Sequence, residues 1–537
     1  MKPPICLLLP VVAMTLAATF AQDTPKVQSE TKGKDKTASQ AKALPKSQTD
    51  LIPGSGENRA TPPDLIKVMP GFEVELLYSV PSEEQGSWVA LCLDDKGRFY
   101  VGDQYGGLYR FLAPPPGQAV DPQTVEKVPA AIRGVNGLHF ADGVLFANVN
   151  DNEKKIPSGF YKVTDSDGDD RLDRVELLRE MNPGGDHGLH GIVPVPDSDD
   201  LYLICGNRVA PTEAVSTSPM LKNWGEDQLL PRMPDGRGHN RHVLAPGGMI
   251  YRVSRDGKRF SLVAGGFRNI YDAAVNSAGE LFTYDSDMEW DMNTPWYRPT
   301  RVNHVISGGE FGWRNGAGKR PEFYADNLPA TLNIGPGSPT GTTFGYGAKF
   351  PAKYQQALFG LDWSWGKIYA IHLEAKGASY TGTKEEFISG TPLPVTDVVI
   401  RPQDGAMYFT VGGRRVQSGF YRVTYVGGED ASPAPLDITL TAEAKLRREL
   451  EAFHIKTDPE AVAAAWPHLA HPDRYVRWAA RTAIEHQPLD SWKSKALSET
   501  DPEKQLGALL ALCRAGGVCP YHRVPPKPLG VPPGEKR

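Results

Sequence analysis

Residues 88–111 read WVALCLDDKGRFYVGDQYGGLYRF, and the rest of the chain repeats the unit that this stretch contains. An apolar run with alternating side chains ends in a turn that contains Asp and Gly, and a second run rich in aromatic residues follows. Alternation with a period of two is typical of β-strands, and a short turn with Asp or Gly favours an antiparallel hairpin. The stretch therefore predicts strands joined by tight turns.

Similar units recur at irregular spacing between Pro63 and Gly428, which gives about six units. The 55 glycines and 47 prolines of the chain supply the turns that many short strands need. A β-sandwich needs fewer strands and a shorter chain. We therefore expect an all-β fold, a six-bladed β-propeller with long inserted loops, over residues 63–428. The further copies are VNGLHFADGVLFANVND (135–151), HGIVPVPDSDDLYLICGN (190–207), MIYRVSRDGKRFSLVAGGFRNIYDAAVNSAGELFTYDSD (249–287), FPAKYQQALFGLDWSWGKIYAIHL (350–373) and VTDVVIRPQDGAMYFTVGGRRVQSGFYRVTY (395–425).

Residues 436–517 have a different pattern. LTAEAKLRRELEAFHI (440–455) carries leucines at helical spacing, and the segments after it begin with Asp-Pro or His-Pro, which places proline in the first turn of a helix. Paired short helices of this kind predict a short α-helical segment of HEAT-like repeats. Because such arrays need about three or more units and an end cap, residues 518–537 are expected to form a disordered tail of a truncated C-terminus.

The N-terminus predicts export. Lys2 precedes the apolar run ICLLLPVVAMTLAATF, and a plausible cleavage site follows Ala21, so residues 1–21 are expected to be a signal peptide. The run is short for a stable membrane span. Residues 22–62 carry few large apolar side chains in their first part and are expected to be a disordered linker. We therefore expect a secreted or periplasmic protein of bacterial type.

Composition excludes some functions. The net charge of -5 gives no reason to expect nucleic acid as a partner. Five cysteines are present, of which Cys92 and Cys205 lie in apolar strand patterns and are expected to be buried hydrophobes. The motif C-x-x-C-H is absent, so no covalently attached haem is predicted in this chain.

Two motifs carry chemistry at positions that precede predicted inner strands. His187 and His190 lie in GGDHGLHG, where a neutral imidazole can accept the proton of a sugar or alcohol hydroxyl. Arg268 and Asn269 offer fixed donors for an anionic cofactor or substrate. Two alternatives stay open for the histidines: a transition-metal site shared with the pair at 239 and 242, or hydrogen bonds that only stabilise turns.

Two acidic sets are candidate calcium sites. The first follows the alternation of an EF-hand-like loop, although the sixth position holds Asp170 where that loop prefers glycine. The second follows the Arg-Asn motif. The alternatives are a solvated hairpin tip for the first and loop caps or ion pairs with arginines for the second. The first set is Asp165, Asp167, Asp169, Asp173 and Glu176, and the second is Asp285, Asp287 and Glu289.

The blade series, the histidine loop and the G-x-R-N step resemble the soluble glucose and sorbosone dehydrogenases. The run FTYDSDMEWDMNTPWYRPTRVNHVISGGEFGWR (282–314) further resembles a planctomycete-type secreted family, often labelled membrane-bound dehydrogenase or haem-binding, in which HEAT repeats and a c-type cytochrome follow the propeller. The resemblance implies a six-bladed propeller that uses pyrroloquinoline quinone and calcium. It also implies that His187 or His190 is the base and that Arg268 and Asn269 hold the quinone.

The chain departs from this family in residues that contact the quinone. Ser364 or Trp365 lies near the position where the dehydrogenases carry a lysine. The stretch PLPVTDVVI (392–400) lacks the basic residues that contact the quinone in the dehydrogenases, and Arg414 and Arg415 are the nearest candidates to replace them. We therefore expect a dehydrogenase-like oxidation of a sugar or alcohol, with electrons passed to a cytochrome c-type partner. The alternatives are a non-catalytic propeller that binds a glycan or a protein, with the helices as a docking segment, and electron transfer that depends, in an intact relative, on a haem domain lost from this chain.

Overall fold

The computed structural model describes residues 59–212, 218–221, 240, 243, 245–291, 294–314, 318–319 and 322–517, and its side chains except those of 289–296 and 318–319. The predicted signal peptide, most of the predicted linker and the predicted tail lie outside these residues, as does the second histidine pair at 239 and 242. Among the described residues, no helix combines the length and the apolar character that crossing a bilayer requires.

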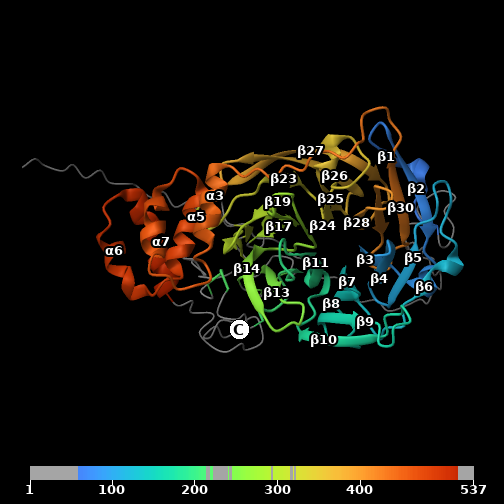
Figure 1. Ribbon diagram of the computed structural model, residues 1–537, viewed down its shortest axis with the longest axis horizontal. Coiled ribbons are helices and arrows are strands. Elements are labelled where there is room, and N and C mark those ends of the chain that lie inside the picture. The colour runs from blue at the N-terminus through green and yellow to red at the C-terminus, as the bar shows by residue number, and fades with distance from the viewer. Residues whose placement is uncertain are drawn as a thin grey trace, which may run out of the picture. The chain divides into compact units, whose positions relative to one another are not determined.

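Six β-sheets lie around a common centre, which confirms the predicted six-bladed β-propeller (Figure 1). The innermost strand of each sheet packs against the innermost strands of its two neighbours, and that of the sixth sheet packs against that of the first, so the ring is closed. The innermost strands are β3 (Trp88–Leu93), β7 (Val135–Ala141), β11 (Leu189–Pro194), β15 (Ala273–Val275), β24 (Pro339–Phe344) and β28 (Val395–Arg401).

In each of the first five blades, the strands next to the innermost one follow in chain order and pair antiparallel, as the repeated strand–turn–strand units predict, and blades 3 and 5 each carry one further edge strand from elsewhere in the chain. Blade 1 adds β4 (Arg98–Asp103), β5 (Leu108–Leu112) and β6 (Glu126–Lys127), and blade 2 adds β8 (Val144–Val149), β9 (Gly159–Thr164) and β10 (Arg174–Glu180). Blade 3 adds β12 (Leu201–Cys205), β13 (Gly248–Val253), β14 (Phe260–Phe267) and the parallel edge strand β20 (Gly309–Glu310). Blade 4 adds β16 (Leu281–Asp285), β19 (Thr300–Val305) and β23 (Leu332–Gly335), and blade 5 adds β25 (Leu358–Asp362), β26 (Lys367–Lys376), β27 (Ser379–Gly390) and β1 (Ile66–Val68).

The sixth blade closes the ring with a strand from the start of the domain. Its strands β29 (Ala406–Val411) and β30 (Gly419–Tyr425) follow β28, but its outermost strand is β2 (Phe72–Ser79), which pairs antiparallel with β30. Ala60 and Thr61 are also buried against this closure, where the Tyr421 hydroxyl donates to the Thr61 carbonyl at 2.9 Å. Residues just before the predicted boundary at Pro63 therefore also pack on the propeller.

Small elements lie in the connections. The ribbons β17 (Met288–Asp291) with β18 (Thr294–Arg298) and β21 (Trp313–Arg314) with β22 (Gly318–Lys319) belong to the long insertions of blade 4. Cys92 and Cys205 are buried free thiols inside blades, as the apolar patterns predict, and Cys513 is exposed. The helical turns are α1 (Ser82–Gln85), α2 (Ala352–Gln355), η2 (Pro63–Leu65), η3 (Pro122–Thr124) and η4 (Gly185–His187).

Short helices follow the propeller, as the sequence predicts. Asp473 and Asp501 cap the two longest, because each carboxylate accepts two backbone N–H groups of the first helical turn. Their assignment to HEAT repeats stays a prediction. The helices are α3 (Ala442–Glu451), α4 (Ala461–Ala465), η5 (Trp466–Ala470), α5 (Arg474–Glu485), η6 (Leu489–Ser491), α6 (Lys493–Ser498) and α7 (Pro502–Gly516).

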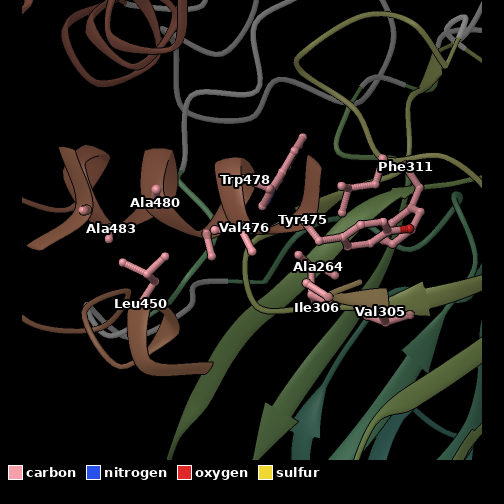
Figure 2. Packing of buried hydrophobic residues seen from close by; sticks show 14 of the residues in the cluster. Ala264, Val305, Ile306, Phe311, Leu450, Tyr475, Val476, Trp478, Ala480 and Ala483 are labelled. Carbon is pink, nitrogen blue, oxygen red and sulfur yellow. The ribbon is translucent and has the colours of Figure 1, made fainter. Parts of the chain in front are cut away.

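The helical segment shares one hydrophobic core with blades 3 and 4. Figure 2 shows Tyr475 and Val476 of α5 turned towards Ala264 and Ile306 of the propeller. The Trp478 indole N–H donates to the carbonyl of Gly308 at 3.2 Å, so its polar atom is satisfied at the junction. The helices are therefore packed on the propeller as part of its core.

Candidate functional site

A cavity of about 700 Å³ opens at one end of the propeller. Its walls come from the starts of inner strands, from loops that lead into them, and from turns between the second and third strands of several blades. Loops of a propeller converge at this end of the ring, which is why propellers bind ligands there. Lining residues include Gln104, Asp186, His187, His190, Arg208, Arg268, Asn269, Tyr271, Asp287, Trp363 and Arg414.

His187 ends the short helix η4 and is buried in the cavity wall. Its Nδ1 lies 2.7 Å from the side-chain oxygen Oδ1 of Asn207. An amide oxygen only accepts hydrogen bonds, so Nδ1 carries the proton in this pair. The basic lone pair is then on Nε2. A neighbouring acceptor that holds one tautomer of a neutral imidazole is a common feature of general bases.

His190 lies at the start of β11 and has a different environment. Its Nε2 is 3.1 Å from Oδ1 of Asn269, whose amide nitrogen donates to the carbonyl of Asp186 at 3.1 Å and so fixes the orientation of the amide. Nε2 therefore carries the proton. The remaining nitrogen, Nδ1, is buried without a hydrogen-bond partner, and burial lowers the pKa of His190 to about 4. The ring stacks on Tyr271 with centroids 4.5 Å apart. His190 is thus a neutral residue that positions Asn269.

Asp285 organises the Arg-Asn step. It is completely buried, and its carboxylate accepts the backbone N–H groups of Arg268 at 3.1 Å and Asn269 at 2.9 Å. Nη1 of Arg268 donates to the Ser286 hydroxyl at 3.0 Å. Both residues of the step are therefore held at the cavity wall, with the Arg268 guanidinium among the lining groups.

The second acidic set does not act as one group. Asp287 lines the cavity and accepts the backbone N–H of Gly337 at 3.3 Å, whereas the oxygens of Asp285 are used by backbone amides. The Glu289 side chain lies outside the described side chains. Calcium at this set stays a prediction, and Asp287 is the member with direct access to the cavity.

Arg414 and Arg415 follow β29 and both adopt left-handed backbone conformations, with φ of 52° and 64°. Left-handed φ values cost conformational energy in residues with a Cβ. The two side chains point to different groups. Arg414 lines the cavity, pairs with Asp186 at 2.9 Å and lies over the Trp363 ring at 5.1 Å. Arg415 is directed to Glu153 at 3.3 Å, outside the cavity lining.

Sequence reasoning missed several residues of the cavity, among them Arg208 and Trp363. Each follows the second strand of its blade, in the same relative position as Ser286 and Arg414 in other blades. Burial lowers the pKa of Arg208. The signal that identifies both is position within the repeat, since the turn after the second strand faces the cavity in each of these blades.

The acidic loop of blade 2 lies apart from this cavity. Asp165, Asp167 and Asp169 bring carboxylate oxygens within 4.8 Å of one another. Asp173 instead accepts the backbone N–H and hydroxyl of Ser166 at 3.0 and 2.7 Å. Glu176 lies on β10, 4.0 Å from a lysine. Three of the five predicted ligands are therefore assembled.

The turn of this loop explains its unusual sixth residue. Asp170 has a φ of 68°, which is the left-handed conformation that favours glycine in such loops. Its side chain pairs with Lys96 at 2.8 Å and with Arg98 at 2.5 Å. These two ion pairs hold the loop against blade 1. Calcium binding by the loop stays a prediction.

No family model matches the chain, and no curated protein matches it. Solved structures do. The pyrroloquinoline-quinone-bound aldose sugar dehydrogenase of Streptomyces coelicolor aligns with a TM-score of 0.44 at 15% identity over 66% of this chain and 100% of that chain. The holo form of the pyranose dehydrogenase quinone domain of Coprinopsis cinerea aligns with a TM-score of 0.45 at 12% identity over 67% and 97%. The calcium structure of a Trichoderma reesei protein of carbohydrate-active enzyme family AA12 aligns with a TM-score of 0.50 at 11% identity over 69% and 99%. The last alignment shows that the two chains share the propeller fold.

Proposed function

We propose that the propeller oxidises a hydroxyl of a sugar or alcohol with the help of a bound quinone. The supporting observation is the cavity that contains His187 in its basic tautomer together with the guanidinium groups of Arg208, Arg268 and Arg414. A hydroxyl-bearing substrate needs a base, and an anionic planar cofactor needs fixed cationic donors. The cavity supplies both.

The lining residues fit an anionic quinone. Arg268 and Asn269 are fixed by Asp285, and Arg414 extends the donor set from the opposite blade. Trp363 and Tyr271 offer flat apolar surfaces in the same cavity. When bound, a quinone supplies a two-electron acceptor for the hydride of the alcohol carbon. Asp287 offers a hard carboxylate for calcium beside this donor set.

Each residue then has a stated part. Nε2 of His187 accepts the hydroxyl proton, while the amide oxygen of Asn207 holds Nδ1–H and stabilises the imidazolium that forms. His190 stays neutral and orients Asn269. The assignment makes His187 the base and His190 a positioning residue, although the sequence pattern treats the two alike.

The experiment is reconstitution of the purified protein with pyrroloquinoline quinone and Ca²⁺, followed by dye reduction with a panel of aldoses and alcohols. His187→Gln should lower kcat by about 10²–10⁴-fold and leave the affinity for the quinone unchanged. His190→Gln should mainly weaken quinone binding, because His190 orients Asn269. His372→Gln, on β26 away from the cavity, is the matched control. Saturable sugar binding without quinone binding would support the non-catalytic glycan-binding alternative instead.

We also propose that the acidic loop of blade 2 binds calcium and that the protein is exported and passes electrons to a cytochrome c-type acceptor. The loop proposal rests on the three assembled carboxylates. Calorimetric titration with Ca²⁺ should show a site that Asp167→Ala removes. Cell fractionation and reduction of added cytochrome c during turnover test the other two points.

A further inference from the structure

A second cavity lies between α5, α7 and residues 322–327 of the insertion in blade 4. Its volume is about 240 Å³, and it shares no lining residue with the cavity of the proposed oxidation. Three arginines of α5, Arg474, Arg477 and Arg481, line it together with one carboxylate, Glu503, and with apolar side chains that include Trp478 and Leu506. The cavity therefore combines cationic groups with an apolar wall.

Arg481, which lines this cavity, has an unsatisfied donor. The residue is 4% exposed, its Nη1 donates to the carbonyl of Ala325 at 2.8 Å, and its guanidinium lies 4.1 Å from the centre of the Trp478 ring. Nη2 is buried without a hydrogen-bond partner. A buried charged donor that lacks an acceptor is unfavourable, so the position is suited to an acceptor from a ligand. Burial also lowers the pKa of Arg481 to about 10.

The charges around Arg481 are not balanced. Glu485 is 3.1 Å from Arg481 and also accepts from Arg514 at 2.9 Å, so one carboxylate serves two guanidinium groups. Arg474 and Arg477 donate to backbone carbonyls, which carry no net charge. Glu503 is a carboxylate among the residues that line the cavity, against three arginines, and Asp326 lies close enough to act on Arg481. Positive charge is therefore in excess in the lining itself, and an anion would neutralise it.

We propose that this cavity binds a small carboxylic acid with an apolar body. A carboxylate matches the planar fork of an arginine and accepts two parallel hydrogen bonds. The apolar wall fits a ring or short aliphatic group, since a cavity of about 150 Å³ already holds benzene. Inorganic phosphate would neutralise the positive charge, but it has no apolar group to pack against the apolar wall.

Benzoate, benzyl alcohol and inorganic phosphate are the probes, titrated into the full-length protein and followed by ligand-observed NMR. Benzoate should bind saturably, and the uncharged ring and the ringless anion should each bind at least ~10-fold more weakly, because each lacks one half of the recognition. Undetectable binding of benzoate, or phosphate binding as tight as that of benzoate, would overturn the proposal.

Variants locate the binding. Arg481→Leu should weaken benzoate at least ~10-fold, and since this change also removes contacts of α5, a second variant tests the cavity from its exposed rim. Leu506 is 57% exposed, so Leu506→Glu should leave the fold intact and repel benzoate by a carboxylate at the rim. Arg255→Gln, in a surface ion pair of blade 3, is the matched control. Benzoate affinity unchanged in Leu506→Glu would contradict the assignment.

Discussion

Arg447 joins the helical segment to the propeller through a buried ion pair, and its removal gives a quantitative test of that junction. Its side chain is 2% exposed. Nη2 donates to Oε1 of Glu280 at 2.5 Å, Nη1 donates to Glu451 at 2.8 Å, and Nε donates to the carbonyl of Ala378 at 3.1 Å. Arg447→Met keeps much of the volume and removes all three contacts.

The expected loss follows from what stays behind. Glu280 keeps Arg448 and His304 as partners at 3.0 and 2.7 Å, but it loses the guanidinium that is buried with it. Breaking a buried pair by removing one partner costs about 3–5 kcal/mol. Arg448→Met removes a cation from the same carboxylate, yet this side chain is 37% exposed, so its loss should cost at most about 1 kcal/mol.

The assay is urea unfolding followed by tryptophan fluorescence, with both variants, with Glu280→Gln, and with the double variant Glu280→Gln/Arg447→Met. The double variant should lose less than the sum of the single changes by at least about 1 kcal/mol, because the two residues share one interaction. If Arg447→Met and Arg448→Met had equal effects, or if the double variant were additive, the buried pair would not stabilise the junction and the reasoning would fail.

Three further predictions concern the inner strands of the propeller and the core that it shares with the helices. Burial raises the pKa of Asp272 to about 7 from 3.8, and burial together with the neighbouring Asp272 also raises the pKa of Asp397. The protonated form of Asp272 therefore stabilises the folded state fully below about pH 4, and this contribution is lost as the pH rises through 7. Asp272→Asn should make the dependence of Tm on pH less steep, and an unchanged profile would refute the assignment. Gly137→Ala should lower the free energy of unfolding by about 2–3 kcal/mol, because the added Cβ would lie 2.0 Å from the carbonyl oxygen of His190. Gly428→Ala, which has open space around the added Cβ, should have almost no effect in the same thermal denaturation assay. Equal effects of the two substitutions would contradict this. Trp478→Ala should lower the unfolding free energy by about 3–5 kcal/mol in the same assay, and a loss below about 1 kcal/mol would show that α5 is not part of the shared core.

The fold was predictable because each blade repeats a local pattern. The turn after Cys92 and the turns at equivalent places in other blades contain Asp and Gly, and these residues report hairpins directly. Closure of the ring was not predictable from such patterns, since it pairs Phe72 with Tyr425, and no local signal identifies a partner that distant.

The candidate site was predictable in part for the same reason. His187, Arg268 and Asn269 precede inner strands, and the fold places loops of that kind at one end of the ring. Their hydrogen bonds were not predictable: Asp285 was a candidate metal ligand in the sequence, yet its carboxylate holds backbone amides in the structure. The two histidines differ only through the amides of Asn207 and Asn269, which approach from other parts of the chain.

One strand of blade 4 connects the helical segment with the cavity. β16 begins after Glu280, which Arg447 and Arg448 hold at the junction, and it ends at Asp285, which holds the backbone of Arg268 and Asn269. The strand pairs with β19 along its whole length and with β15 over residues 281–283, so its two ends are fixed relative to each other. The helices therefore cover and anchor the far end of the element that positions the proposed cofactor donors. This placement gives the helical segment a structural part in the propeller that does not depend on any ligand of its own.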